Sequence, residues 1–366
     1  MHVGVWKCAM AAPSDVSELK ALIASGAVDP ATIVALIGKT EGNGGANDFT
    51  RGYATLSYQV LLAEALGLSL AEIASRIAFV WSGGTEGVLS PHATILTREP
   101  AKDAATGGKR LALGIAMTPA IPPELIGSMA HVEAVSEAVA KALAEAGIDD
   151  PADVHYVQVK GPLLTPASIA AADAAGKSVV SRDPNASKAF ARGAMALGVA
   201  LALGEIAPDD LVPEAIARDM NLFSKVASTS AGGELTQCEV LLFGNSAQAT
   251  SPFRIGHAVL KDAIDSISVR RAIADAGLAL SADPTEAETA QIAAVFAKAE
   301  ASPTGRIRGR RNTMLSDADI NYERHARAAL GAVIASVTSD PAIFVSGGTE
   351  HQCAPGEAPI AAIVRA

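Results

Sequence analysis

Three serines occur in similar short turns, roughly one in each third of the 366-residue chain. Residues 82–86 and 346–350 both read Ser-Gly-Gly-Thr-Glu, and residues 230–233 read Ser-Ala-Gly-Gly. A short apolar run before a Ser-Gly-Gly turn is typical of a buried strand that ends at the serine. Serine becomes a nucleophile when a base removes its proton, and amides uncovered by glycine could hold an oxyanion.

A lysine and an arginine precede each serine in the same order. The three sets are Lys39, Arg51 and Ser82; Lys160, Arg192 and Ser230; and Lys298, Arg324 or Arg327, and Ser346. A buried lysine has a lowered pKa and can act as the base. Arginine presents fixed N–H donors, which suit the carbonyl oxygens of a planar ligand. Three converging Ser–Lys pairs with three arginines therefore predict one central pocket.

The elements that position these residues repeat as well. Each third is predicted as a strand, a helix, a strand ending in lysine, a loop, an arginine, a helix, a strand ending in serine, and a closing strand. The predicted helices include residues 16–25, 53–66, 129–146, 193–203, 266–276 and 328–337. This order predicts an α/β protein of three similar units, 1–103, 109–250 and 253–366, around a pseudo-threefold axis.

The acidic residues near the lysines indicate which pair does the chemistry. Glu41 and Glu300 each lie two residues after a lysine, on the same face of an extended strand, where they could keep that lysine protonated. Lys160 is followed by Gly161 and Pro162. We therefore predict Lys160 as the base and Ser230 as the nucleophile. Ser228 stays an alternative nucleophile, because the middle turn departs from the Ser-Gly-Gly pattern.

Composition excludes several classes of protein. The net charge of −10 argues against nucleic acid and anionic membranes as partners. No apolar stretch reaches membrane-spanning length. Cys8, Cys238 and Cys353 form no disulfide framework, which favours a reducing cytoplasm. The histidines lack the H-E-x-x-H and H-x-H spacings of zinc hydrolases.

Two readings from other classes remain open. Residues 38–40 (Gly-Lys-Thr) match the end of a phosphate-binding P-loop, but position 33 is isoleucine where that motif has glycine. A nucleotide-binding protein is therefore the main alternative from another class. A non-catalytic ligand-binding module on the same scaffold is a further alternative, against which the intact Ser230–Lys160 pair argues.

Several motifs together resemble the cyanuric acid hydrolase/barbiturase family of ring-opening amidohydrolases. They are residues 38–44, residues 47–53, the two Ser-Gly-Gly-Thr-Glu copies and residues 348–352 (Gly-Thr-Glu-His-Gln). The resemblance covers the whole chain. It implies three α/β units whose sheets form a central barrel with helices outside, and a homotetrameric assembly. It also implies hydrolysis of a cyclic amide by Ser230 with Lys160, without a cofactor for the chemistry.

The resemblance also implies a set of ligand contacts. Those to substrate are Arg51, Ser82, Gly83, Arg192, Ala231, Ser346 and Gly347, with Arg324 or Arg327 and the lysines Lys39 and Lys298. A structural magnesium or calcium ion is implied near Glu300, Thr349, Gln352, Cys353, Ala354 and Glu357. An ion pair with Lys298 is the alternative role for Glu300.

Cyanuric acid is the expected substrate, because its three carbonyls match a threefold pocket. The expected product is carboxybiuret, which loses carbon dioxide to give biuret. Barbituric acid, opened to ureidomalonate, is the close alternative.

Overall fold

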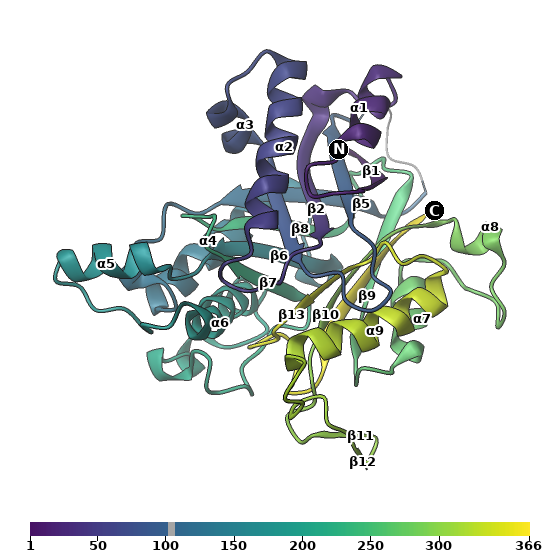
Figure 1. Ribbon diagram of the computed structural model, residues 1–366. Helices are drawn as coiled ribbons and strands as arrows, with labels where there is room; N and C mark the ends of the chain where they lie inside the picture. The colour runs from purple at the N-terminus through teal and green to yellow at the C-terminus, as the bar shows by residue number, and fades with distance from the viewer. Residues whose placement is uncertain (102–106) are drawn as a thin grey trace.

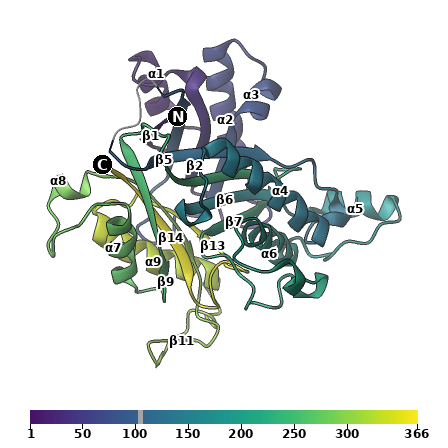
Figure 2. The same ribbon diagram turned by 180° about the vertical axis from the view of Figure 1, so that it is seen from behind.

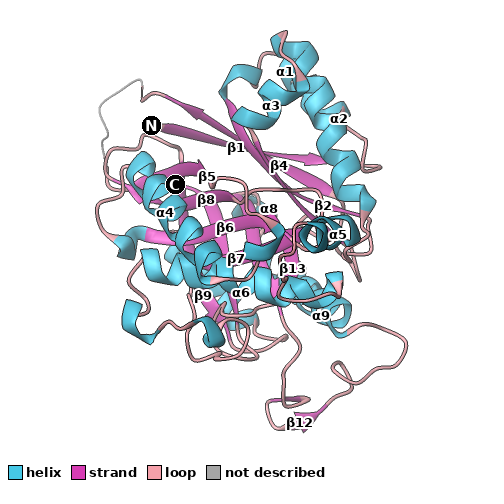
Figure 3. Ribbon diagram, turned by 90° about the vertical axis from the view of Figure 1, so that its left-hand side faces the viewer, coloured by secondary structure: helices cyan, strands magenta, loops and turns pink. Residues whose placement is uncertain are grey.

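The computed structural model describes residues 1–101 and 107–366, and in these residues three four-stranded sheets occupy the centre of the molecule (Figure 1). Helices lie around the outside of the sheets, as the views from behind and from the side show (Figures 2 and 3). We call the three sheets with their helices units A, B and C. The predicted end of the first unit at residue 103 lies outside the described residues.

The units share the order strand, helix, strand, arginine-bearing helix, strand, strand, to which each adds short elements of its own. Unit A contains β1 (His2–Ala9), α1 (Ser17–Ala24), β2 (Ile33–Thr40), α2 (Phe49–Leu66), α3 (Leu70–Arg76), β3 (Ala78–Gly83) and β4 (His92–Glu99). Unit B contains β5 (Arg110–Met117), α4 (Met129–Ala146), β6 (Val154–Pro162), α5 (Pro166–Ala174), α6 (Pro184–Ala202), β7 (Ala227–Gly232) and β8 (Glu239–Ser246). Unit C contains β9 (Phe253–Leu260), α7 (Ser266–Asp275), α8 (Glu286–Thr289), β10 (Ile292–Ala299), the short β11 (Arg306–Ile307) and β12 (Arg310–Arg311), α9 (Tyr322–Thr338), β13 (Phe344–Gly347) and β14 (Ala358–Arg365).

The three sheets share one topology. Their strand orders are β1-β4-β2-β3, β5-β8-β6-β7 and β9-β14-β10-β13. In each sheet the opening and closing strands pair antiparallel, and the lysine strand pairs parallel with the serine strand. The predicted repeat is therefore present. The described pairings of these strands stay within each unit, so the sheets meet through side chains and do not close into one hydrogen-bonded barrel.

The main core lies where the inner faces of the three sheets meet. It brings together Val5 and Val80 of unit A, Tyr156 and Phe243 of unit B, and Phe296 of unit C, all buried. The rings of Tyr156 and Phe296 stack with centroids 5.3 Å apart. Phe296 also contacts the ring of Phe243, with centroids 5.8 Å apart, so it packs against two aromatic residues of unit B. A Phe→Ala change in such a core typically costs about 3–5 kcal/mol.

A separate apolar cluster lies between each sheet and its own helices. In unit A it joins Leu36 of β2 to Leu19 of α1 and Tyr58 of α2, and clusters of the same kind serve units B and C. Each sheet is thus covered on both faces. This explains why its strands read as nearly continuous apolar runs.

The structure corrects the predicted boundaries of one strand and three helices. Strand β2 continues to Thr40, so residues 38–40 are strand and not the loop of a P-loop, which removes the main basis for a nucleotide site. Helices α2, α6 and α9 begin before their arginines, since side chains of Asp48, Asp183 and Asn321 cap them. Each arginine therefore lies inside a helix and not in the loop before it.

In the described part of the chain no single helix is long and apolar enough to span a membrane. Helices α2 and α3 together are long and apolar enough, but the chain bends by 102° between them.

Candidate active site

Each predicted lysine lies directly beside its predicted serine on the neighbouring parallel strand. The register pairs Lys39 with Ser82, Lys160 with Ser230, and Lys298 with Ser346. The lysine and serine strands of each unit end at one edge of its sheet. A parallel pair places such partners on the same face, about 4.8 Å apart along the hydrogen-bonding direction.

One central cavity collects these strand ends from all three units. Its lining includes the three serines with the residues that follow them, Lys160, and one arginine per unit. The full set is Gly44, Arg51, Trp81, Ser82, Gly83, Lys160, Lys188, Arg192, Ser230, Ala231, Glu323, Arg327, Ser346 and Gly347. The sequence prediction that distant segments meet at one pocket therefore agrees with the structure.

The lysines also connect neighbouring units. Lys39 Nζ donates to the carbonyl of Val345 at 2.8 Å, Lys160 Nζ to that of Trp81 at 3.1 Å, and Lys298 Nζ to that of Thr229 at 2.8 Å. Each of these carbonyls belongs to the residue just before a serine of another unit. The lysines therefore hold the serine strands of the three units in place around the cavity.

The arginines form a second ring of contacts between units. Arg51 Nε donates to Glu234 at 3.0 Å. Arg192 and Arg327 each donate through Nε and Nη2, Arg192 to Glu350 and Arg327 to Glu86. Each glutamate lies four residues after a serine, in the turn of the next unit. Bidentate pairs of this kind fix the plane of a guanidinium group, so the glutamates orient the arginines toward the cavity.

The electrostatic reason for choosing Lys160 is wrong. Its Nζ lies 3.3 Å from Glu234 Oε1, so an acid does face it, but from the serine turn and not from its own strand. Burial lowers the pKa of Lys160, and the charge of Glu234 opposes that shift. Glu41, the predicted partner of Lys39, is exposed, and the acids that face Lys39 are Glu86 and Asp48.

Burial acts on the other two lysines in the same way. It lowers the pKa of Lys39 well below its usual range, helped by the nearby charge of Arg327. It lowers the pKa of Lys298 to about 7, with Arg192 as the next contributor. A lowered pKa is thus common to all three lysines. What separates Lys160 is position, since of the three it is the one that lines the cavity.

The serines differ in their hydrogen bonds. Lys39 Nζ donates to Ser82 Oγ at 3.1 Å. The buried Oγ atoms of Ser230 and Ser346 have no hydrogen-bond partner among the described residues. The alternative nucleophile Ser228 is fully buried and donates to Gln158 Oε1 at 3.0 Å, away from the cavity lining. The geometry therefore favours Ser230 over Ser228.

The sequence left open whether Arg324 or Arg327 is the third arginine, and the structure places Arg327 at the cavity. Arg327 is 3% exposed and lines the cavity. Arg324 lies one turn earlier on α9, is exposed, and donates to the carbonyl of Asn43 at 3.1 Å. Lys39 and Lys298 lie behind the serines, where they hold backbone carbonyls, rather than on the cavity lining.

Two charged cavity residues escaped the sequence analysis. Lys188 lies four residues before Arg192 on α6, and Glu323 lies four residues before Arg327 on α9. Their side chains approach to 3.9 Å across the boundary between units B and C. One helical turn separates each from its arginine, so aligning the helices of the repeat by their arginines would have found both.

The residues expected near a cation only partly assemble. Glu300 accepts hydrogen bonds from Thr349, and a neighbouring cavity is lined by Glu300, Thr349 and Cys353. Burial raises the pKa of Glu300, and the charge of Glu350 adds to it, which suits a cation there. Glu357 instead pairs with Lys261 at 2.7 Å.

The other expected ligands and the alternative role of Glu300 fare differently. Gln352 uses its side-chain oxygen to accept from the N–H of Thr229. Ala354 lies in the turn and accepts from the N–H of Glu357. Lys298, the alternative ion-pair partner of Glu300, donates to two backbone carbonyls instead.

Fold and site define a class: an α/β protein of three similar units, each of which supplies a serine and an arginine to one cavity, with a buried lysine beside each serine. The chain belongs to the family described as amidohydrolase ring-opening proteins, whose model matches residues 4–365.

Similar proteins support this assignment. A "Cyclic amide hydrolase" of Azorhizobium caulinodans is 70% identical over 100% of both chains. A "Cyanuric acid amidohydrolase" of Bradyrhizobium diazoefficiens is 51% identical over 99% of this chain and 98% of its own. A solved structure described as a cyanuric acid hydrolase superimposes with a TM-score of 0.95 at 50% identity, covering 100% of this chain and 99% of its own.

Proposed function

We propose that this protein hydrolyses cyanuric acid, opening its six-membered ring. Relatives about half identical to it over nearly their full length carry the name cyanuric acid amidohydrolase. The observation that carries the proposal is the cavity, which offers three serines and three arginines from equivalent positions. A ring with three equivalent carbonyls is the ligand that such symmetry fits.

In the proposed reaction Ser230 Oγ attacks one ring carbonyl while Lys160, in its neutral form, takes the serine proton. The two residues are register partners on β7 and β6, and both line the cavity. Ser230 Oγ is buried without a hydrogen-bond partner, which leaves it available to a ligand. Hydrogen bonds between a nucleophile and its base are often loose before substrate binds.

The arginines are suited to holding the other carbonyl oxygens. Arg192 and Arg327 each donate hydrogen bonds from Nε and Nη2 to a glutamate. The Nη1 group of each guanidinium is thereby left to bind other partners. We propose that these donors bind substrate carbonyls. The backbone N–H groups of Gly83, Ala231 and Gly347, which follow the serines, are the proposed donors to oxygen at the reacting carbon and its equivalents.

The proposed bond changes are those of acyl transfer. The Oγ–C bond forms, the adjacent ring C–N bond breaks, and Lys160 returns the proton to the leaving nitrogen. Water then attacks the acyl-enzyme and the serine leaves with a proton, which releases carboxybiuret. Loss of carbon dioxide from that product gives biuret.

Barbituric acid is the second candidate substrate, opened to ureidomalonate. It is kept because the relative with 70% identity is named only as a cyclic amide hydrolase. Barbituric acid replaces one ring nitrogen by carbon, so discrimination depends on contacts at one edge of the ring.

The deciding experiment follows the ultraviolet absorbance of cyanuric acid and of barbituric acid with purified protein. We expect cyanuric acid to be consumed faster. Ser230→Ala should reduce turnover at least ~1,000-fold, since removing a nucleophile usually abolishes covalent catalysis. Ser82→Ala, the matched change in unit A, should keep measurable turnover. If the protein consumed neither compound, the proposal would be contradicted.

Two further expectations rest on the family resemblance, and a third rests on the cysteines. A structural magnesium or calcium ion would bind at Glu300 with backbone carbonyls of the turn at Thr349 and Cys353, since oxygen ligands suit these ions. A homotetramer is the proposed assembly, to be tested by light scattering on the purified protein. The cytoplasm is the proposed compartment, in keeping with the free, buried state of Cys8, Cys238 and Cys353.

A further inference from the structure

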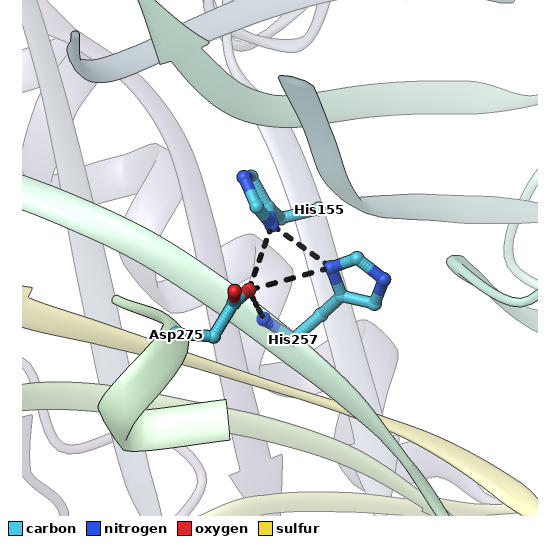
Figure 4. Close-up of side chains that lie close together, drawn as sticks. All are labelled: His155, His257 and Asp275. Carbon is cyan, nitrogen blue, oxygen red and sulfur yellow. Dashed lines mark hydrogen bonds and ion pairs between the residues drawn. The ribbon is translucent and has the colours of Figure 1, made fainter. Parts of the chain in front are cut away.

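A cluster of metal-ligating side chains lies away from the central cavity, at the boundary between units B and C. His155 belongs to β6, His257 to β9 and Asp275 to the C-terminal end of α7. The two imidazoles and the carboxylate point toward one another (Figure 4). Their ligand atoms all lie within 4.8 Å of one another, the one such group found among the described residues.

We propose that His155, His257 and Asp275 bind one divalent transition-metal ion of the zinc type, which ties unit B to unit C. Two imidazole nitrogens and a carboxylate form a donor set that suits zinc, nickel or copper better than magnesium or calcium. Three protein ligands leave a fourth position for water.

The spacing of the donor atoms supports one shared ion. The Nδ1 atoms of His155 and His257 are 2.8 Å apart. Asp275 Oδ2 lies 3.3 Å from the first and 3.8 Å from the second. A tetrahedral zinc ion with bonds of about 2.0–2.1 Å holds its ligand atoms roughly 3.3 Å apart. Small side-chain rotations would bring all three donors to that separation.

The protonation states fit metal binding. Burial lowers the pKa of His155 to about 4, and it also lowers the pKa of His257. Both imidazoles are therefore neutral near pH 7 and have a lone pair to offer. Arg254 and Lys225 contribute positive charge nearby, while Asp153 contributes negative charge.

The position of Asp275 is otherwise unfavourable. It is the last residue of α7, where the partial negative charge of the helix end repels a carboxylate. Its Oδ2 accepts a hydrogen bond from the backbone N–H of His257 at 2.9 Å, which fixes the carboxylate beside the imidazoles. A bound cation would compensate both the carboxylate and the helix end.

Access to the cluster is open. The side chain of His155 is 13% exposed, that of His257 30% and that of Asp275 46%. An ion can therefore reach the site without unfolding, and the protein keeps the site partly formed before binding. The buried cysteines do not compete, since burial raises the pKa of each of their thiols.

The test measures zinc binding by the full chain after stripping with a chelator and dialysis. Millimolar magnesium is kept present so that oxygen-rich sites, including that proposed at Glu300, are filled. Zinc is titrated against a chromophoric zinc indicator, and the melting temperature is recorded with and without zinc. We expect one zinc per chain and a higher melting temperature when zinc is bound.

The variants are His155→Gln, His257→Gln and Asp275→Asn, each of which should weaken zinc binding at least ~10-fold. The matched control is His325→Gln, which changes another surface histidine paired with an aspartate, Asp317 at 3.1 Å. The control should bind zinc as the parent does. Equal zinc binding by the parent and all three variants would overturn the proposal.

A second measurement covers variants that fail to fold. Cobalt(II) added to the unmodified protein should give visible ligand-field bands of a nitrogen and oxygen site. Absence of these bands, or a thiolate charge-transfer band in their place, would contradict the proposed ligands. In that case the short contact between His155 and His257 is a hydrogen bond between two neutral imidazoles.

Discussion

Lys160 Nζ lies 3.3 Å from Glu234 Oε1, and Glu234 also accepts a hydrogen bond from Arg51 Nε at 3.0 Å. One carboxylate thus contacts both the proposed base in unit B and an arginine of unit A. Glu234 itself stays ionised, because burial, which raises its pKa, is outweighed by Lys160 and Arg51, and its pKa is about 2. Burial lowers the pKa of Lys160, and the opposing charge comes chiefly from a residue in the turn of its own serine.

Replacing Glu234 should shift the pH dependence of the reaction. Neutral Lys160 increases as pH rises through its pKa, so kcat/KM should rise over that range. The negative charge of Glu234 raises this pKa, and Glu234→Gln should therefore move the acidic limb of the pH–rate profile to lower pH.

The matched control for this change is Glu86→Gln. Glu86 raises the pKa of Lys39 in the same way. Because Lys39 is not the proposed base, Glu86→Gln should leave the acidic limb of the pH–rate profile in place. A limb that moves with Glu86→Gln, and not with Glu234→Gln, would assign the base to Lys39.

Lys160 and Lys39 should respond differently to removal. Lys160→Ala should lower kcat by ~100-fold or more, the usual contribution of a general base. Lys39→Ala removes hydrogen bonds to Ser82 and to the carbonyl of Val345, so it should lower stability by about 1–3 kcal/mol and keep part of the activity. Single-turnover kinetics and thermal unfolding of both variants would measure this, and the reverse pattern would reject the assignment.

Arg327 and Arg324, one helical turn apart, provide a test of the substrate contacts. Arg327→Lys breaks the bidentate pair with Glu86 and should reduce kcat/KM by ~10–100-fold, the value of a charge-assisted hydrogen bond. Arg324→Lys, on the exposed face, alters a hydrogen bond to the carbonyl of Asn43 and should change kcat/KM by less than about threefold, as most surface substitutions have small effects. Similar losses in both variants would mean that Arg324 reaches substrate.

Glu239 should limit stability above neutral pH. Burial raises its pKa to about 7, although the N–H of Phe79 and the charge of Lys160 oppose the shift. Between the ordinary pKa of glutamate and this value the folded state binds a proton that the unfolded state releases. The free energy of unfolding therefore falls as pH rises through this range.

The change that tests this is Glu239→Gln, which keeps the oxygen acceptor for Phe79. At pH 8 the variant should be more stable than the parent, by up to about 3 kcal/mol for a shift of this size. The difference should shrink below pH 5. Denaturant unfolding at both pH values measures it, and an equal difference at both would show that the carboxyl is not titrating.

The proposed structural cation can be tested separately from activity. Magnesium or calcium added to chelator-treated protein should raise its melting temperature. At an ion concentration a hundredfold above the dissociation constant, the free energy of unfolding should rise by about 3 kcal/mol. Glu300→Gln should abolish that gain, while Glu357→Gln should retain most of it because Glu357 pairs with Lys261. A gain of the same size in Glu300→Gln would place the ion elsewhere.

Much of the fold could be predicted from the sequence, because each repeat unit is a continuous segment and the same pattern occurs three times. Apolar runs before Ser82 and Ser346 predicted β3 and β13, and the Lys–Arg–Ser order predicted equivalent units. The strand predicted to end in Lys39 continues to Thr40. A buried lysine can lie inside a strand when backbone carbonyls of another unit accept its hydrogen bonds, as that of Val345 does for Lys39. The local sequence around the lysine does not reveal those carbonyls.

The sequence by itself determined which residue types recur and in what order, since periodicity and turn residues act within one segment. Tertiary structure alone decided the partners. Glu234 faces Lys160 because β6 and β7 pair within one sheet, whereas Glu86 faces Arg327 and His155 meets His257 because different units pack together. Charge interactions depend on distance in space, and distance between units is not encoded in spacing along the chain.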